Sequence, residues 1–314
     1  MHSFIEKYAP QRKRAWMAIE AFYKTLPVSL VDMGWEFAQR LGRQTSYSGE
    51  FADALTHPAA ARIAYLPLWV IESYLENNTT TTEIEELQNC LFASSFLGFC
   101  SIRIQDDLLD EDEPNTSVDE LLLSNLFANE AVRYLQRIFP SESPLWEHHT
   151  RNWREYVHAV NLDKLRDRNG LTPYGERDLL HIGHKAALLK TYPIAVALYM
   201  GAENHMGAIG RLMDTFNTAI QLQNDIQSIK EDIESAHYTY PLTSVTLDLG
   251  HSANTHPSKG DFQEALIFSD SLVQRSGMSC EVFRDLICLD SEMAYHFPRS
   301  ARGDRWHPFS PWMN

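Results

Sequence analysis

The sequence predicts a single all-helical domain, and three observations support this fold class. Apolar residues recur at three-to-four-residue spacing over most of the 314 residues. Alternating strand patterns are scarce, and the breaks between periodic segments are short polar groups with proline or glycine rather than linkers. A chain of this length with 44% hydrophobic residues can bury one large core, so we expect one all-α domain over residues 1–314.

The periodic segments give the expected helices in chain order. They cover residues 11–26, 59–77, 82–107, 118–139, 174–203, 206–234 and 261–294. The breaks fall at residues 140–144, 169–173, 237–241 and 250–260. Each segment carries apolar residues at helical spacing, and each break contains proline or glycine, which ends a helix locally.

Composition and charge exclude several classes of protein. The 27 basic and 42 acidic residues give a net charge of −15, which repels a phosphate backbone, and no long Lys/Arg stripe is present. We therefore expect no nucleic-acid partner. The four cysteines form no C-x-x-C pair and no dense disulfide framework, which is typical of a reduced, cytoplasmic protein. Charged residues and proline interrupt the most apolar stretches, so stable membrane insertion is not expected.

A carboxylate cluster follows the apolar segment 92–105. The sequence FASSFLGFCSIRIQ leads directly into Asp106, Asp107 and Asp110. On a helix, Asp106 and Asp110 share a face one turn apart, while Asp107 is rotated aside. Like charges this close need a counter-cation, and Mg²⁺ prefers hard oxygen ligands together with substrate phosphates. A solvated acidic helix end has the same composition, so this cluster does not decide the function by itself.

A second row of oxygen donors lies in residues 221–232, QLQNDIQSIKED. Asn224, Ser228 and Asp232 recur at i, i+4 and i+8, so an amide, a hydroxyl and a carboxylate share one face of the expected helix. These donors suit a further Mg²⁺, although each could also be a solvated surface position. The presence of both rows in one helical chain favours the metal-binding interpretation.

The two rows resemble those of the trans-isoprenyl diphosphate synthase and class I terpene synthase superfamily. DDLLD at 106–110 is similar to the first aspartate-rich motif, NDIQSIKED at 224–232 takes the place of the second, and YTYPL at 238–242 is similar to the Thr-Tyr-Pro stretch that follows it. The resemblance implies a single-domain helical bundle with a central apolar active-site cavity. It also implies three Mg²⁺ ions that bind with the diphosphate between two metal-binding helices.

Departures from the synthase pattern favour a cyclase. The second motif reads N-D-x-x-S-x-x-x-D, which resembles the Asn/Ser/Glu triad of terpene cyclases with Asp in the last place. Residues 61–68, ARIAYLPL, lack the cations of the synthase Gly-Lys-x-x-Arg-Pro stretch, and residues 112–125 contain no Lys or Arg. The resemblance therefore implies a Mg²⁺-dependent terpene cyclase, a lyase of isoprenoid biosynthesis that ionises one linear allylic prenyl diphosphate and releases diphosphate.

The resemblance also assigns roles to individual residues. The metal ligands expected from it are Asp106, Asp110, Asn224, Ser228 and Asp232, with Asp107 orienting a ligand or an arginine. The expected substrate-binding residues are Arg177, Lys185, Lys190, Lys230, Arg305, Phe99, Ile102 and Tyr192. Lys185 is preferred as the diphosphate contact for its spacing to Asn224, and Lys190 competes because Lys190-Thr191 reproduces a family dipeptide.

Further positions are placed by the same comparison. Phe99 and Ile102 precede Asp106 at helical spacing and are expected to line the cavity. His237 replaces the lysine that usually precedes Thr-Tyr-Pro. Arg305 lies in segment 298–314, which is expected to cap the active site.

Other functions remain open on the sequence. The nearest alternative is a chain-elongating trans-prenyl diphosphate synthase, and the second is a non-catalytic helical interaction protein. A zinc hydrolase would need His148, His149, His181 and His184, but these form no H-E-x-x-H pattern. The substrate length from C10 to C25, the product skeleton and a homodimeric state are not determined by the sequence.

Overall fold

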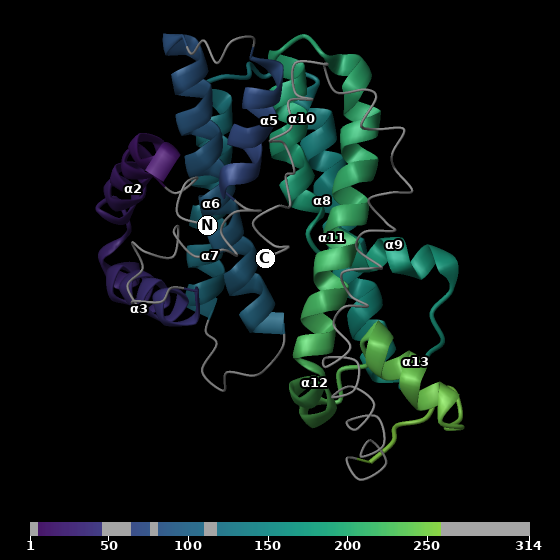
Figure 1. The fold of residues 1–314 in the computed structure, drawn as a ribbon. Helices are drawn as coiled ribbons and strands as arrows, with labels where there is room; N and C mark the ends of the chain where they lie inside the picture. The colour runs from purple at the N-terminus through teal and green to yellow at the C-terminus, as the bar shows by residue number, and fades with distance from the viewer. Residues whose placement is uncertain (1–5, 46–63, 76–80, 110–117, 259–314) are drawn as a thin grey trace. The chain divides into compact units, whose positions relative to one another are not determined.

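The described part of the chain is helical. The computed structural model describes residues 6–45, 64–75, 81–109 and 118–258, and these residues contain no strand. Figure 1 shows the helices in chain order. The prediction of an all-α protein is confirmed for this part of the chain. The expected helix at 261–294 and the capping segment 298–314 lie outside the described residues.

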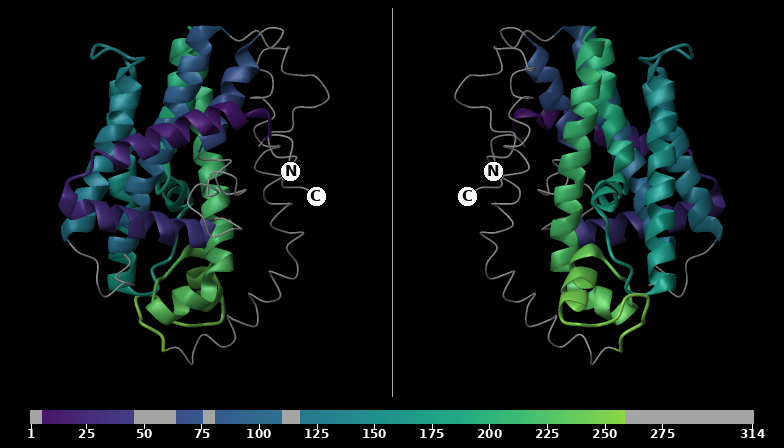
Figure 2. Two further views of the ribbon diagram at one scale, coloured as in Figure 1. Left: turned by 90° about the vertical axis from the view of Figure 1, so that its left-hand side faces the viewer. Right: turned by 90° about the vertical axis from the view of Figure 1, so that its right-hand side faces the viewer.

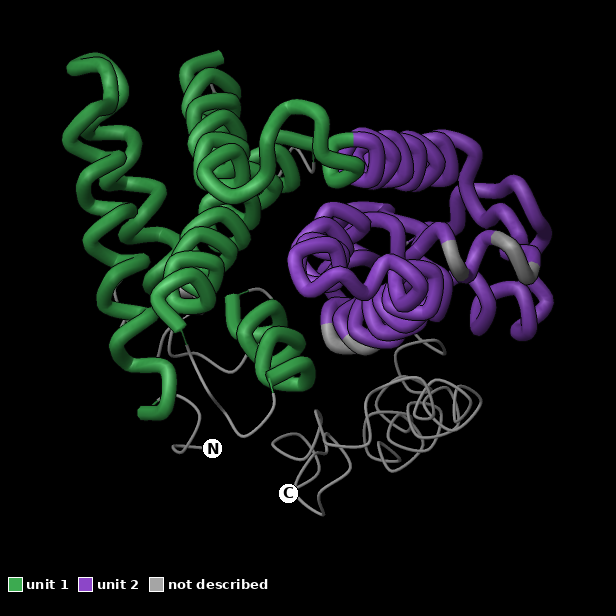
Figure 3. The backbone as a smooth tube through the Cα atoms, turned by 90° about the horizontal axis from the view of Figure 1, so that it is seen from above, with its two compact units in different colours: residues 1–146, 298–312, 314 green, residues 147–297, 313 purple. Residues whose placement is uncertain are grey.

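The chain divides into two compact units, which Figure 3 distinguishes by colour. Unit 1 comprises residues 1–146, 298–312 and 314, and unit 2 comprises residues 147–297 and 313. The DDLLD motif at 106–110 belongs to unit 1, and the NDIQSIKED motif at 224–232 belongs to unit 2.

Unit 1 is built around one long helix. Its helices are α2 (Ala9–Tyr23), α3 (Val28–Thr45), α5 (Leu66–Tyr74), α6 (Thr82–Leu109) and α7 (Val118–Gln136). The 28-residue helix α6 packs along α7, and α2 and α3 run across this pair, as Figure 2 shows. Helix α3 was not among the predicted segments, although its apolar residues Phe37, Ala38 and Leu41 are buried.

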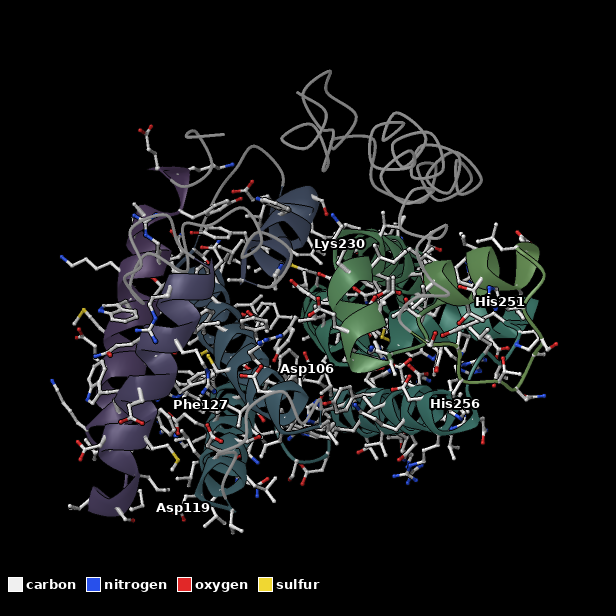
Figure 4. All side chains as sticks on the ribbon, turned by 90° about the horizontal axis from the view of Figure 1, so that it is seen from below. Asp106, Asp119, Phe127, Lys230, His251 and His256 are labelled. Carbon is white, nitrogen blue, oxygen red and sulfur yellow. The ribbon has the colours of Figure 1, made fainter. Side chains whose placement is uncertain are left out.

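Aromatic side chains fill the core of unit 1. The ring of Phe127 on α7, labelled in Figure 4, lies 5.1 Å from that of Phe22 and 5.9 Å from that of Tyr23. The ring of Phe37 on α3 lies 5.7 Å from that of Phe127. Offset and edge-on ring pairs at these distances add to the apolar burial, so Phe127 joins three helices.

Small polar residues let α6 approach α7 closely. The hydroxyl oxygens of Ser101 and Ser124 are 3.0 Å apart, and Ser124 Oγ lies 3.0 Å from the carbonyl oxygen of Ser101. Ser94 Oγ donates to the carbonyl of Ala131 at 2.8 Å. Buried hydroxyls need such partners, and these contacts explain the small side chain at position 101 by helix packing.

Unit 2 contains the remaining described helices, apart from the first two residues of α8. These are α8 (Leu145–Asn169), α9 (Glu176–His184), η4 (Ala187–Lys190), α10 (Thr191–Tyr199), η5 (Glu203–His205), α11 (Met206–Gln227), α12 (Ile229–Ser235) and α13 (Tyr240–Asp248). The predicted segment 174–203 is therefore divided into several elements, and α8 and α13 were not predicted. The segment 206–234 is also divided, because α11 ends before Ser228.

Gly183 allows α9 to lie against α11. A Cβ atom at this position would lie 2.3 Å from Thr218 Oγ1, 2.7 Å from the backbone nitrogen of Thr218 and 2.8 Å from the carbonyl oxygen of Asp214. Distances under 3 Å from backbone atoms cannot be relieved by rotating a side chain. Any side chain larger than hydrogen would push the two helices apart.

Two backbone features shape the end of the second motif. Ser228 joins α11 to α12 with φ −90° and ψ 4°, so the segment bends at the middle oxygen donor. Ala236 ends α12 with φ 56° and ψ 38°, in the left-handed region that glycine usually occupies. Behind this turn, Ile229, Ile233, Tyr238 and Leu242 form a buried apolar cluster with Leu171.

Candidate functional site

The first motif lies at the end of α6. Asp106, labelled in Figure 4, and Asp107 lie in the last turn of this helix, and Asp110 lies outside the described residues. The Asp106 side chain is 44% exposed, whereas that of Asp107 is 10% exposed. Asp106 is therefore the more accessible of the two carboxylates to a metal ion from solvent.

Two arginines hold the Asp107 carboxylate. Arg103 Nη2 lies 2.7 Å from Asp107 Oδ1, and Arg40 Nη2 on α3 lies 3.1 Å from Asp107 Oδ2. Arg103 also contacts Asp106 at 3.1 Å, and Arg40 contacts Glu120 of α7 at 3.4 Å. Asp107 therefore contacts two arginines, while its expected role in orienting a metal ligand or an arginine stays a prediction.

The second motif brings two of its three oxygen donors together. Ser228 Oγ lies 3.3 Å from Asp232 Oδ2 and 3.4 Å from Asp232 Oδ1. The same hydroxyl donates to the backbone carbonyl of Asn224 at 3.1 Å, and Asn224 is an exposed residue. Thr239 Oγ1 donates to Asp232 Oδ2 at 3.2 Å. The Ser228 hydroxyl and the Asp232 carboxylate thus lie side by side, while the position of the Asn224 side chain as a third ligand stays a prediction.

Burial makes the Asp232 carboxylate a strong candidate for a cation. The residue is 7% exposed, and burial raises the pKa of its carboxyl to about 7, against the opposing influence of His237. A buried carboxylate without a full counter-charge is costly, and a bound divalent cation would relieve this cost while displacing the proton. Hydroxyl, carboxylate and amide oxygens also match the ligand preference of Mg²⁺, so the donor set fits this ion.

A neighbouring acidic residue of the same motif faces the interior. Asp225 is 4% exposed, and Gln221 Nε2 donates to its Oδ1 at 2.8 Å. Burial raises the pKa of the Asp225 carboxyl, while Lys185 lowers it. The motif therefore has one inward carboxylate in addition to its three expected ligands.

Cationic side chains lie next to this row in unit 2. Lys185 Nζ donates to Asp163 Oδ2 of α8 at 2.5 Å, and His237 Nε2 lies 3.6 Å from the same oxygen. The backbone nitrogen of His237 donates to the carbonyl of Asp232 at 2.8 Å. The backbone of His237 therefore contacts Asp232, the last expected metal ligand, and the side chains of His237 and Lys185 both contact Asp163.

The environment of His237 favours its charged form. Burial lowers the pKa of the imidazole. Asp167 and Asp163 raise this pKa by more than burial lowers it, so the pKa of His237 is about 8. The pKa of Asp163 is lowered despite its burial, because Lys185 and His237 lie beside it. At neutral pH the group thus contains two cations beside two carboxylates.

Lys190 has different surroundings from Lys185. Its side chain is 5% exposed, against 22% for Lys185. Its ammonium contacts Glu155 of α8 and, at 2.6 Å, Asp214 of α11. A lysine buried between two carboxylates is held by the fold, which supports Lys185 as the better candidate for a diphosphate contact.

The carboxylates around Lys190 form a further cluster with His184. Ligand atoms of Glu155, His184 and Asp214 lie within 4.8 Å of one another. The Lys190 ammonium already supplies positive charge to both carboxylates, so we assign no metal to this cluster. His148 and His149 are not members of it: His148 contacts Arg151, and His149 accepts from Trp153 Nε1 at 3.1 Å.

The other expected residues have the following positions. Lys230, labelled in Figure 4, is an exposed residue of α12. Arg177 lies in the first turn of α9, and Arg305 lies outside the described residues. Phe99 is partly buried against the core of unit 1, with its ring 6.2 Å from that of Phe96. Ile102 is partly buried, and Tyr192 is buried in α10. Their roles in lining a cavity stay predictions.

The sequence did not reveal four charged residues of this region. Arg40 and Arg103 contact the first motif, and Asp163 and Asp167 contact Lys185 and His237. A usable signal existed for the second pair, because Asp163 and Asp167 are four residues apart and share a helix face. That signal needs a helix over 145–169, which hydrophobic periodicity did not predict.

Comparisons with protein-family models and with curated proteins find no match to this chain. The functional assignment therefore depends on the residues themselves. No helix in the described ranges is both long and apolar enough to cross a bilayer.

Proposed function

We propose that this protein is a Mg²⁺-dependent terpene cyclase that ionises one linear allylic prenyl diphosphate and releases diphosphate. One observation carries the proposal. In unit 2, the Ser228 and Asp232 oxygens lie side by side, the charge of His237 acts on Asp232, and His237 shares the Asp163 carboxylate with Lys185. Oxygen donors for a divalent ion beside cations for an anion are what a metal–diphosphate complex requires.

The side chains divide the chemical work between them. Asn224, Ser228 and Asp232 would hold one metal ion, and Asp106 with Asp110 would hold others, while Arg103 and Arg40 fix Asp107 in place. Bound Mg²⁺ supplies positive charge that stabilises the leaving diphosphate. Lys185 and His237 donate to the diphosphate oxygens as negative charge develops there, which lowers the barrier to breaking the allylic C–O bond.

The carbocation left behind needs protection from water. Phe99 and Ile102 are the proposed lining of a dry apolar cavity, where an aromatic face stabilises a cation and water is excluded. A cyclised hydrocarbon or alcohol is the expected product. The proposal covers the reaction class and leaves the chain length of the substrate to experiment.

A single set of incubations tests the proposal. The protein is incubated with Mg²⁺ and, separately, with geranyl, farnesyl, geranylgeranyl and geranylfarnesyl diphosphate, and the products are identified by gas chromatography and mass spectrometry. We expect a cyclic hydrocarbon or alcohol from at least one substrate without isopentenyl diphosphate. Longer diphosphates that form only when isopentenyl diphosphate is added would show a chain-elongating synthase instead. No product under either condition would favour a non-catalytic protein.

Substitutions in the two motifs give the matching controls. Asp106→Ala and Asn224→Ala each remove an expected metal ligand from a half-buried and an exposed position, respectively. We expect both to abolish turnover while the circular dichroism spectrum keeps its helical form. Full activity in either variant would contradict the metal assignment.

A further inference from the structure

Two carboxylates of α8 organise the cations beside the second motif. Asp163 and Asp167 are one turn apart and share a face of the helix. Asp163 Oδ2 accepts from Lys185 Nζ at 2.5 Å and lies 3.6 Å from His237 Nε2. One oxygen atom therefore brings together two cations that are far apart in the sequence.

Asp167 fixes the orientation of the imidazole. Its Oδ2 lies 2.9 Å from His237 Nδ1, and its Oδ1 accepts from the backbone nitrogen of Tyr238 at 2.9 Å. The ring is thus held at one nitrogen, while its Nε2 is at ion-pair distance from Asp163 but beyond a normal hydrogen bond. This leaves Nε2 the nitrogen better placed to donate to another anion.

We propose that Asp163 and Asp167 are positioning residues, which hold Lys185 and His237 together as a pair of donors for the diphosphate. The inference rests on the proposed function for the identity of the anion. The two carboxylates touch no substrate in this scheme, and they act through the lysine and the histidine. A diphosphate carries two phosphoryl groups, so two fixed cations can bind it at two points.

The exposure of the four side chains supports a binding role. The side chains of Asp163, Asp167, Lys185 and His237 are 18–22% exposed, so small anions can approach the group. Lys190 provides the contrast, because it is 5% exposed and enclosed by Glu155 and Asp214. A partly open cluster lets a further anion reach the lysine and the histidine while the two carboxylates stay in place.

The chain offers a matched pair of variants for the test. Asp163→Asn removes the carboxylate that contacts Lys185, and Glu155→Gln removes a carboxylate of the same helix that contacts Lys190. Both substitutions preserve side-chain size and remove one negative charge. Only the first is expected to disturb anion binding, so the comparison separates positioning from a general loss of charge.

The readout is the binding of inorganic pyrophosphate in the presence of Mg²⁺, measured by titration calorimetry on the full chain. We expect Asp163→Asn to bind at least about tenfold more weakly than the unsubstituted protein and Glu155→Gln to stay within about threefold. Asp163→Glu keeps the charge and should recover most of the affinity. If Asp163→Asn does not fold by circular dichroism, Asp167→Asn, which releases the imidazole, gives the same comparison.

Three results would overturn the inference. They are no binding of pyrophosphate to the unsubstituted protein, equal losses in Asp163→Asn and Glu155→Gln, or no recovery in Asp163→Glu. A different result would overturn the proposed function alone. If no prenyl diphosphate is turned over while pyrophosphate binding still depends on Asp163, the cyclase proposal is wrong and the positioning role stands.

Discussion

The Asp232 side chain is buried in the fold, but metal binding requires its charged form, and burial disfavours that form when no metal is bound. It is buried with Ser228 and Thr239 as hydrogen-bond partners, and its raised pKa shows that its charged form is disfavoured in the fold. Residues that a site needs charged often cost stability until the ligand binds. Asp232 is therefore the position where activity and stability should diverge most clearly.

Asp232→Asn should stabilise the metal-free protein at alkaline pH while abolishing turnover. The folded-state pKa of about 7 lies above the ordinary value of 3.8, so the folded state binds the proton more tightly than the unfolded state. The stabilising contribution of this group is present below about pH 4 and is lost as pH rises to about 7. Replacing the carboxylate by an amide removes that loss, which is on the order of 4 kcal/mol at pH 8.

Thermal unfolding in EDTA at pH 5 and pH 8 measures this effect. The difference between the two pH values should shrink in Asp232→Asn relative to the unsubstituted chain. An equal pH dependence in the two proteins would show that Asp232 ionises normally in the fold.

Helix packing in unit 2 depends on one residue without a side chain. Gly183→Ala places a methyl group against the backbone of α11, so α9 and α11 must separate. We expect a loss of about 1–3 kcal/mol in the free energy of unfolding, typical of overpacking. Urea denaturation followed by circular dichroism measures the change.

Gly210→Ala is the matched control for this experiment. Gly210 lies in α11, and a Cβ atom there meets nothing within 4 Å. Alanine favours the helix over glycine by about 0.8–1 kcal/mol, so this variant should be more stable. A loss of stability in both variants would show that close contact between α9 and α11 is not the cause of the loss in Gly183→Ala.

The unpredicted helix α8 shows where sequence patterns fail. Its inward side chains include Asn152, Glu155 and Asp163, which contact Thr191, Lys190 and Lys185. Polar residues such as Asn152 interrupt the buried face that Leu145, Tyr156 and Ala159 form, so hydrophobic periodicity is weak along this helix. In contrast, most buried residues of α6 are apolar, and this helix was predicted nearly to its ends.

The candidate site, like the fold, was predictable only where the signal is local in the sequence. Asn224, Ser228 and Asp232 stand out because their spacing matches a helix face, which is a local property of the sequence. Asp163 and His237 are 74 residues apart in the numbering, and only the folded chain brings their side chains together. The bend at Ser228 was also not visible, because no proline or glycine marks it.

Each compact unit has its own apolar core, and this bears on what a metal does for the protein. The aromatic cluster around Phe127 belongs to unit 1, and the cluster around Tyr238 belongs to unit 2. Neither cluster contains an expected metal ligand. Folding of the described helices should therefore not require Mg²⁺.

Removal of metal should silence the protein without unfolding it. After treatment with EDTA, we expect no turnover of any prenyl diphosphate and an unchanged helical circular dichroism spectrum. Adding Mg²⁺ back should restore activity, and adding Ca²⁺, a larger ion of looser geometry, serves as the control. Loss of the helical signal together with activity would mean that the ion is part of the fold.

The unusual backbone of Ala236 gives protein engineers a simple handle. An alanine in the left-handed region crowds its own methyl group, and glycine avoids that crowding. Ala236→Gly should gain about 0.5–1 kcal/mol of resistance to urea, seen as a higher midpoint concentration. That margin would let the chain carry harmful substitutions elsewhere, such as those needed to reshape a product profile, before expression yield collapses.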